Sequence, residues 1–383
     1  MSNKKNIFSE EIELSEIVLK KTNQAFEMIR QEDIGYMKKT NTKGKKSFKT
    51  QAAAVACVCI LAVSSISAVA AIHHYWGRGM SGNIQASGEQ QQVLTEEKVA
   101  KVYSEEPDSL SLAVTNNGIT IEPDTVVVDD RFAYMSFNIS GYSMEDGMEP
   151  GFEMVNVYQG DNPEDDDARV NMSGTMYNGI ISDENGAPVY EDGTSVKMHE
   201  DGSIICHYTD SNGNMEYIIQ ASIGNENDSF LGKTIHVNLK NLGTFSKAKF
   251  TPAAEGNWNF EIILPDVSSS QNIKVGQKVE GTDFTIESIS ISPISMKVNY
   301  SASAAPAGHE DDLGIPEVKG VILKDGTRIP YLTGAGGSGF TDSSKHNAYQ
   351  IAGYNRVIDV DDVAALIVLT SPESEKVEIP ISK

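Results

Sequence analysis

The sequence predicts a mainly β protein, in which a short cytoplasmic helix and one transmembrane helix precede two extracellular antiparallel β-sandwich domains in series. Three observations lead to this fold class. An uncharged run, Ala52 to Ile72, directly follows a cluster of lysines. From about Leu110 onward, short apolar or alternating runs are separated by Asn-Gly and Asp-Gly turns, a pattern typical of antiparallel strands. A break at Pro265 to Gln271 divides these strands into two sets.

Residues 1–50 are predicted to hold one cytoplasmic helix and a basic tether. Ser15 suits the N-cap, and apolar residues then recur at helical spacing. A helix of about 16 residues is marginal alone in water, so its apolar stripe needs a partner. The candidates are another protein, the membrane surface or a second copy. The predicted partner-binding residues are Ile17, Val18, Ala25, Met28 and Ile29.

The run from Ala52 to Ile72 is 21 residues without a charge, enough to cross a bilayer core of roughly 30 Å. A buried core helix is one alternative reading. A cleaved signal peptide is another, since Ala68-Val69-Ala70 fits a small-x-small cleavage pattern. About 50 residues precede the run, however, and it exceeds the usual 7–15 apolar residues of a signal peptide, which favours a retained transmembrane helix over residues 51–73. The lysine excess before it predicts a cell-membrane protein with a cytoplasmic N-terminus and extracellular C-terminal domains.

Charge and cysteine content restrict the function. The chain has 383 residues and a net charge of −23. Residues 1–50 carry 11 Lys and Arg against 7 Asp and Glu, so the acidic excess lies entirely in the rest. Such a surface will not bind nucleic acid by neutralising phosphates. Cys206 is the one cysteine in the predicted exported part, beyond Cys57 and Cys59 of the apolar run, so that part has no internal disulfide and depends on buried cores.

The exported part is predicted to contain three regions. Residues 74–109 form a stalk with one short helix, Gln90 to Tyr103. Residues 110–265 form the first sandwich, with a polar insertion near 160–215, and residues 266–383 form the second. The expected strands of the first are Leu110–Thr115, Ile119–Ile121, Val126–Val128, Phe132–Ile139, Glu153–Tyr158, Ile204–Tyr208, Tyr217–Ala221, Thr234–Leu239 and Trp258–Leu264. Those of the second are Asp283–Ser292, Met296–Ser301, Val318–Leu323, Arg328–Leu332, Tyr349–Ala352, Ala364–Leu369 and Val377–Ile381.

Candidate metal ligands have simpler interpretations. Adjacent residues on a helix diverge by about 100°, so His73-His74 chelates poorly and suits the membrane interface better. The acidic run from Asp161 to Asp167 offers oxygens of the kind that calcium prefers, but we favour a solvated loop. Asp210, Asn212 and Asn214 begin like a calcium-binding loop, yet position 221 is Ala instead of Glu.

No catalytic constellation is visible. Gly334 to Gly339 resembles a phosphate-binding loop in composition alone, and we expect a long flexible hairpin loop there. Ser338 is followed by Gly339 and Phe340, so it does not lie in a nucleophile elbow. We therefore predict a protein that is not an enzyme and carries no cofactor and no metal.

Several of these segments together resemble a family of bacterial membrane proteins that carry the domain of unknown function numbered 4179. The stretch Ile12 to Val18, leading to Ala25-Phe26-Glu27-Met28-Ile29, is similar to the family's opening helix, although many members have Pro where this chain has Ser15. Asn117 to Ile121, Val126 to Arg131 and Ala133 to Phe137 match its best-marked stretch. Trp258 to Ile262 resembles the strand that closes its first domain, and Phe284 to Pro293 resembles the start of the immunoglobulin-like domain that often follows.

The resemblance implies a signalling function. Members are commonly suspected to be anti-sigma factors or envelope sensors, and the family brings no catalytic residues. Our leading hypothesis is a single-pass signalling protein that binds an extracytoplasmic-function sigma factor through the cytoplasmic stripe and an unknown ligand outside. The alternative is a cell-surface binding or structural module, in which the N-terminal piece sets topology alone. An envelope enzyme, assembled by long-range folding, is a third reading.

Overall fold

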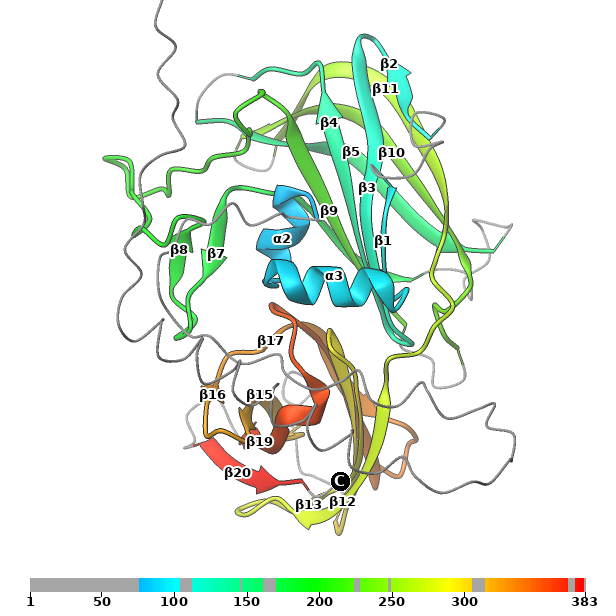
Figure 1. Cartoon of the computed structure of the whole chain (residues 1–383), viewed down its shortest axis with the longest axis vertical. Coiled ribbons are helices and arrows are strands. Elements are labelled where there is room, and N and C mark those ends of the chain that lie inside the picture. The colour runs from blue at the N-terminus through cyan, green and yellow to red at the C-terminus, as the bar shows by residue number, and fades with distance from the viewer. Residues whose placement is uncertain are drawn as a thin grey trace, which may run out of the picture. The chain divides into compact units, whose positions relative to one another are not determined.

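The structure is a computed structural model that describes residues 76–103, 112–144, 147–160, 170–223, 228–246, 249–304, 314–370 and 376–381. All of them lie in one compact unit, Ile60–Lys383. The predicted partner-binding stripe, the predicted span and the acidic run 161–167 lie outside the described residues. The fold is mainly β, with the strands paired in antiparallel sheets (Figure 1).

The predicted architecture with one transmembrane helix requires a correction. The described residues contain two α-helices, α2 (Arg78–Asn83) of 6 residues and α3 (Gly88–Glu96) of 9 residues. At about 1.5 Å per residue these helices extend roughly 9 and 14 Å, against a bilayer core of about 30 Å. Within the part of the chain that the structure describes, no helix is long and apolar enough to cross a membrane.

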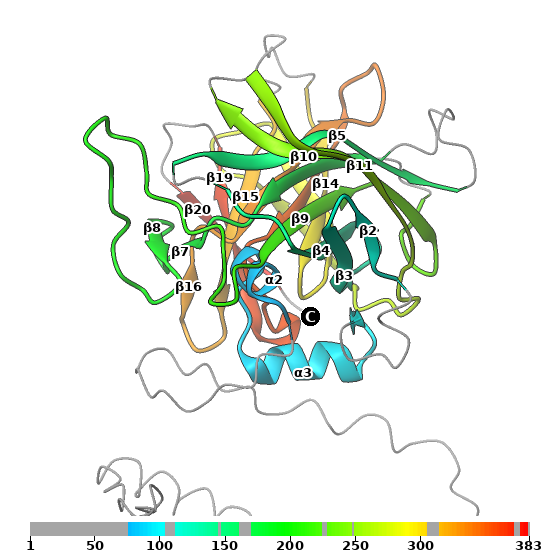
Figure 2. The same cartoon turned by 90° about the horizontal axis from the view of Figure 1, so that it is seen from above.

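The first sandwich packs two sheets around one core. The larger sheet has the order β1-β3-β4-β9-β6, with β2 paired to β3, and the smaller has the order β11-β10-β5. Figure 2 shows the β5, β10 and β11 layer lying across β9, β4 and β3. The bounds are β1 (Ala100–Val102), β2 (Val114–Asn116), β3 (Ile119–Val128), β4 (Phe132–Ser140), β5 (Glu149–Gln159), β6 (Asn171–Met176), β9 (Met215–Ser222), β10 (Thr234–Ser246) and β11 (Lys249–Ile263).

Aromatic pairs join these two sheets. Phe137 of β4 packs on Phe260 of β11 with ring centroids 5.1 Å apart, and Phe152 of β5 meets Tyr217 of β9 edge-on at 4.9 Å. Trp258 is fully buried between the layers, and its indole N–H donates to the Ile119 carbonyl. Burying side chains of this size contributes about 1.5–3 kcal/mol each, so these residues supply much of the first core.

The second sandwich is built in the same way from the C-terminal strands. One sheet has the order β12-β13-β14-β18-β17 and the other β16-β15-β19-β20. Gln350 links them, because its side-chain amide accepts from the Val318 N–H at 2.7 Å and donates to the Val318 carbonyl at 3.1 Å. The bounds are β12 (Gln271–Lys278), β13 (Phe284–Ile291), β14 (Ser295–Ala302), β15 (Glu317–Leu323), β16 (Arg328–Ile329), β17 (Thr333–Phe340), β18 (Asn347–Tyr354), β19 (Val363–Leu369), β20 (Lys376–Pro380) and the 3-10 turn η4 (Val360–Asp362).

The residues expected to form a stalk are packed instead. Residues 76–103, here called the lead segment, comprise α2, α3 and β1. Their apolar side chains enter a buried cluster with β3, β4 and the second sandwich. α3 lies between the two sandwiches in Figure 1, and the Gln90 amide donates to the Val357 carbonyl at 3.3 Å. Ser87 and Gln90 form the capping box that starts α3.

The insertion forms a run of tight turns, called the arm here (residues 177–214). Its strands are β7 (Ile180–Ser182) and β8 (Pro188–Tyr190). The predicted strand Ile204–Tyr208 is absent from the described arm, in which Ile204 makes an isolated bridge to Met198. Tyr190 organises the arm: its hydroxyl donates to the Ile205 carbonyl, and its ring stacks on His207 at 4.6 Å. The arm contacts the second sandwich, because the Arg356 guanidinium reaches the Asp183 carbonyl at 3.2 Å.

Gly334 to Gly339 form most of the edge strand β17 instead of the expected flexible loop. This segment pairs with β18, for example Gly337 with Ile351. Glycine-rich sequence reads as a loop because glycine weakens a strand interior, but the pairing with β18 overrides that local preference.

Candidate functional site

The strongest candidate site surrounds the start of the lead segment, where α2 lies on the outer face of the larger sheet of the first sandwich. α2 has no side-chain cap of its own. Carboxylates from two strands accept its first N–H groups instead. Asp124 of β3 accepts from the Gly77 N–H at 3.1 Å, and Glu216 of β9 accepts from the Gly79 N–H at 2.6 Å. Negative charge at the N-terminal end of a helix is favourable, so these contacts hold α2 on the sheet.

Glycine is required where α2 approaches the sheet. A Cβ on Gly77 would lie 2.3 Å from Asp124 Oδ2 and 2.8 Å from Glu216 Oε2. A Cβ on Gly82 would lie 2.1 Å from the Tyr177 hydroxyl oxygen. Because real Cβ atoms do not come this close to an oxygen, the sequence Gly77 to Gly82 is matched to the carboxylates beneath it.

The two carboxylates differ in their hydrogen bonds. Asp124 also accepts from the Thr125 hydroxyl at 2.9 Å and the Ser136 hydroxyl at 3.1 Å. Glu216 is largely enclosed, and burial raises the pKa of its carboxyl to about 7, with the neighbouring charge of Asp124 adding to the rise. Glu216 therefore changes its protonation state near neutral pH, which is unusual for a carboxyl group.

A cavity of about 400 Å³ opens beside α2. Its walls come from the lead segment and from the arm, which brings Ile181 and Glu191. Arg78 pairs with Glu191 at 2.9 Å, donates to the His207 carbonyl at 2.8 Å and lies over the Tyr177 ring at 5.0 Å. The lining residues are Trp76, Arg78, Ser81, Gly82, Ile181 and Glu191.

This cavity is suited to binding more than to catalysis. Its size falls within the range of small-molecule sites, and it combines apolar walls with one positive and one negative group. None of its six lining residues is a histidine, cysteine or lysine, and the one carboxylate among them, Glu191, is paired with Arg78. The geometry can therefore hold and orient a small polar ligand in contact with the first turn of the lead segment.

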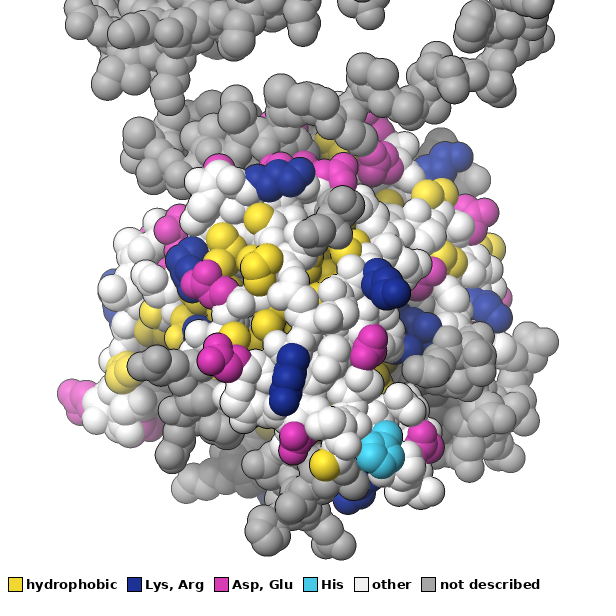
Figure 3. Space-filling view, turned by 90° about the horizontal axis from the view of Figure 1, so that it is seen from below, with side chains coloured by type: hydrophobic (Ala, Val, Ile, Leu, Met, Phe, Trp, Pro, Cys, Tyr) yellow, Lys and Arg dark blue, Asp and Glu magenta, His cyan; other side chains and the backbone are white. Residues whose placement is uncertain are grey.

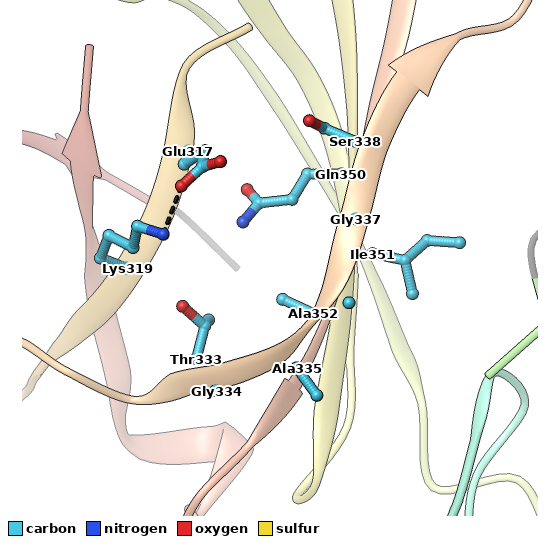
Figure 4. Close-up of a pocket in the computed structure, with 11 residues that line it drawn as sticks. Glu317, Lys319, Thr333, Gly334, Ala335, Gly337, Ser338, Gln350, Ile351 and Ala352 are labelled. Atoms are coloured by element: carbon cyan, nitrogen blue, oxygen red, sulfur yellow. Dashed lines mark ion pairs between the residues drawn. The ribbon is translucent and has the colours of Figure 1, made fainter. Parts of the chain in front are cut away.

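A second cavity, of about 140 Å³, lies between the sheets of the second sandwich. Figure 4 shows Gln350 reaching toward the Glu317–Lys319 ion pair of β15, with Thr333 and Gly334 below. The Gln350 amide is already bonded to Val318, and its oxygen also accepts from the Tyr300 hydroxyl at 3.3 Å. These polar groups serve the packing of the two sheets, so this cavity is the weaker candidate.

A buried carboxylate joins the two sandwiches next to the lead segment. Asp129 follows β3 and has no exposed surface. It accepts from the Arg131 N–H at 2.8 Å and the Phe132 N–H at 2.7 Å, and from the hydroxyls of Ser292 and Ser295 in the second sandwich. Burial raises the pKa of Asp129, and the four hydrogen bonds oppose that rise.

Further close contacts join the two sandwiches and the lead segment at this junction. A Cβ on Gly353 would lie 2.3 Å from the Tyr134 hydroxyl oxygen and 2.7 Å from Phe132 Cε1. The Tyr134 hydroxyl donates to the Tyr354 carbonyl at 3.3 Å. The backbone of Gln85 bonds to Asn355 and Val357 at 2.9 and 2.8 Å, so the lead segment is also attached to the second sandwich.

The residues singled out from the sequence are mostly not at this site. The stripe Ile17, Val18, Ala25, Met28 and Ile29, and the pair His73-His74, lie outside the described residues. Asp210 caps a tight turn by accepting from the N–H groups of Asn212 and Asn214. Cys206 is free and half-buried in the arm. Within the described ranges, no group of three or more His, Cys, Asp or Glu side chains is placed to hold a metal ion.

Sequence reasoning missed Asp124, Asp129 and Glu216. One signal for Asp129 was present, because Val126-Val127-Val128-Asp129-Asp130-Arg131 places charges directly after an apolar run. No sequence signal links Asp124 with Glu216, which are 92 positions apart and meet through the pairing of β3, β4 and β9.

Surface charge gives no further candidate on the face that Figure 3 shows. Basic and acidic side chains are interspersed there, with apolar groups between them. That described face therefore has no continuous basic area of the kind that nucleic acid requires.

Part of the chain matches a known protein family. A family model described as "Domain of unknown function (DUF4179)" matches residues 43–141, which confirms over that segment the family resemblance predicted from the sequence. No curated protein matches the chain. Among solved structures, one described as "The crystal structure of the conserved domain protein from Bacillus anthracis" is similar at 16% identity and a TM-score of 0.42, over 70% of this chain and 84% of that chain.

Proposed function

We propose that this DUF4179 protein is a signalling protein, an anti-sigma factor or envelope sensor, in which the β-rich unit senses a ligand and the N-terminal residues hold a sigma factor. The observation that carries the proposal is the position of the lead segment. The lead segment follows the N-terminal residues along the chain. It packs against both sandwiches and lines the cavity. Binding in the cavity or a shift between the sandwiches would therefore act directly on Trp76 to Asn83.

The proposed partner on the N-terminal side is an extracytoplasmic-function sigma factor. Its groove would accept the stripe Ile17, Val18, Ala25, Met28 and Ile29 in helix-in-groove fashion. Affinity purification of the tagged full-length chain, followed by mass spectrometry, tests this directly. We expect a sigma factor to co-purify with the wild-type chain and to be lost in the Ile17→Asp/Ile29→Asp variant.

A charge-matched control is available on the opposite face of the helix that the sequence predicts. Asn23→Asp with Arg30→Gln changes the net charge by the same two units but leaves the apolar stripe intact. It should keep the sigma factor. Equal capture by all three proteins, or loss in both variants, would contradict docking through the stripe.

The cavity also favours a second function, that of a cell-surface binding or structural module. In that case the N-terminal residues play no part in transcription. Deleting residues 1–35 separates the two functions: signalling predicts altered transcription, whereas a binding module predicts unchanged ligand binding and unchanged transcription. The localisation, in the cell membrane with the N-terminus in the cytoplasm, remains a prediction, which fractionation combined with protease accessibility tests.

A further inference from the structure

We propose that a proton-dependent latch controls the lead segment: one proton at the Asp124–Glu216 pair keeps Trp76 to Asn83 docked on the first sandwich, and its loss at mildly alkaline pH loosens that docking. As a regulatory step, the latch rests on the proposed signalling function. The docking equilibrium itself concerns the described unit alone and is measured without any partner.

The geometry places two carboxylates against one short backbone segment. Both Asp124 Oδ2 and Glu216 Oε2 lie within 3 Å of the position that a Cβ on Gly77 would take. Asp124 has two hydroxyl donors and the Gly77 N–H, so its negative charge is well compensated. Glu216 accepts from the backbone N–H groups of Gly79 and Arg78, but burial raises the pKa of its carboxyl, so the proton of the pair belongs on Glu216.

The other charged and titratable groups around Glu216 do not replace that proton. The positive charge of Arg78 in α2 lowers the pKa of Glu216, but less than burial and Asp124 raise it, and its guanidinium is also bonded to Glu191 and to the His207 carbonyl. Tyr177 stays neutral, because burial raises the pKa of its hydroxyl. Glu122 adds a further carboxylate on the same sheet, bonded to Asn138, which pairs with Glu216 in register.

Proton loss has a defined consequence at this place. With Glu216 ionised, two negative groups face each other in a largely enclosed space, and the repulsion is relieved when the chain above them moves out and water enters. α2 is short and has no side-chain cap, so these two carboxylates are the acceptors for the backbone N–H groups at its start, beside the contacts that Arg78 makes with Glu191 and His207. The pKa of Glu216, raised to about 7 by burial and by Asp124, puts this transition near neutral pH.

Hydrogen exchange of the full-length chain, followed by mass spectrometry, tests the latch. Protection of the peptide that covers residues 76–84 is compared at about pH 6 and pH 8.5, after correction for the intrinsic exchange rate. We expect wild-type protection to fall about tenfold at the higher pH, because pH 6 lies about one unit below the Glu216 pKa of about 7 and each unit corresponds to a tenfold change. Glu216→Gln should keep its protection at both pH values, because the amide oxygen still accepts from the Gly79 N–H and cannot ionise.

Two further variants complete the test. Asp124→Asn removes the repulsion and should reduce the pH dependence, because burial, the larger cause of the raised pKa of Glu216, remains. This variant keeps the test decisive if Glu216→Gln fails to fold. Glu255→Gln, an exposed change on β11, should behave like the wild type. The same fall in all four proteins, or no fall in the wild type, overturns the latch. Neither result depends on a sigma factor, so failure of the latch and failure of the proposed function are told apart.

Discussion

Asp129 and Glu216 are two enclosed carboxylates of the same unit that differ in what faces them. Asp129 accepts four hydrogen bonds, two from its own turn and two from serines of the second sandwich. Glu216 accepts from the backbone N–H groups of Gly79 and Arg78 in α2 and faces Asp124. Burial raises the pKa of both carboxyls, but donors surround the first and a like charge faces the second. Four donors therefore oppose the effect of burial on Asp129, whereas the like charge of Asp124 adds to the effect of burial on Glu216.

Removing the Asp129 carboxylate should give the largest effect. Asp129→Ala leaves two N–H groups and two buried hydroxyls without their acceptor, and we expect the free energy of unfolding to fall by about 3 kcal/mol or more. Denaturant titration followed by tryptophan fluorescence measures this loss. Asp130→Ala is the control: Asp130 accepts from Ser268 and Ser270 at a partly exposed place, so it should cost less than about 1 kcal/mol. Equal losses would show that burial does not set the strength of the Asp129 contacts.

The second largest loss of stability is expected from adding a methyl group at Gly353, where the two sandwiches approach most closely. The methyl group of Gly353→Ala would meet the Tyr134 hydroxyl and Phe132, so we expect a destabilisation of about 1–3 kcal/mol, measured by thermal unfolding. Gly337→Ala on the neighbouring strand is matched, because nothing lies within 4 Å of the added Cβ. If the two variants melt together, the sandwiches are not in contact at Gly353.

Neutralising Glu216 should change how the free energy of unfolding depends on pH more than it changes the magnitude of that free energy. The folded pKa, about 7, lies above the ordinary value of 4.5, so the native chain binds the additional proton between these two values. This stability is fully present below pH 4.5 and is lost as the pH rises through 7. Urea unfolding at several pH values should show that decline in the wild type and a smaller one in Glu216→Gln. Asp129 contributes in the same direction in both proteins, so a decline of equal size would contradict the role of Glu216.

The smallest effect is expected at a surface ion pair away from both carboxylates. Arg328 pairs with Glu378 between β16 and β20, and each side chain is half exposed. Arg328→Ala should lower the unfolding free energy by less than about 1 kcal/mol, and salt should reduce the effect further. A double-mutant cycle with Glu378→Ala isolates the pair. A coupling energy as large as the loss expected for Asp129→Ala would show that solvent exposure does not weaken this ion pair.

Strand prediction succeeded where local pattern and packing agree. The predicted Phe132–Ile139 lies within β4, and the Asn117-Gly118 turn joins β2 to β3 with φ of 48° and 81°. It failed where pairing overrides local preference. β12, which begins at Gln271, was not among the predicted strands, and the glycine-rich segment predicted as a loop forms most of β17. An Asp-Gly turn is read from neighbouring residues, but an edge strand depends on its partner.

The sequence by itself determined the mainly β composition, most of the strands and turns, the acid excess and the family resemblance that the match over residues 43–141 confirms. These follow from alternation of apolar residues and from turn chemistry, which act over a few residues. Tertiary structure alone decided that residues 76–103 pack between two sandwiches, that Asp129 joins those sandwiches, and that Asp124 meets Glu216 beneath α2. The physical reason is separation along the chain, because a carboxylate's hydrogen bonds and pKa depend on its neighbours in space. Asp124 and Glu216 are 92 positions apart and meet only when β3, β4 and β9 pair.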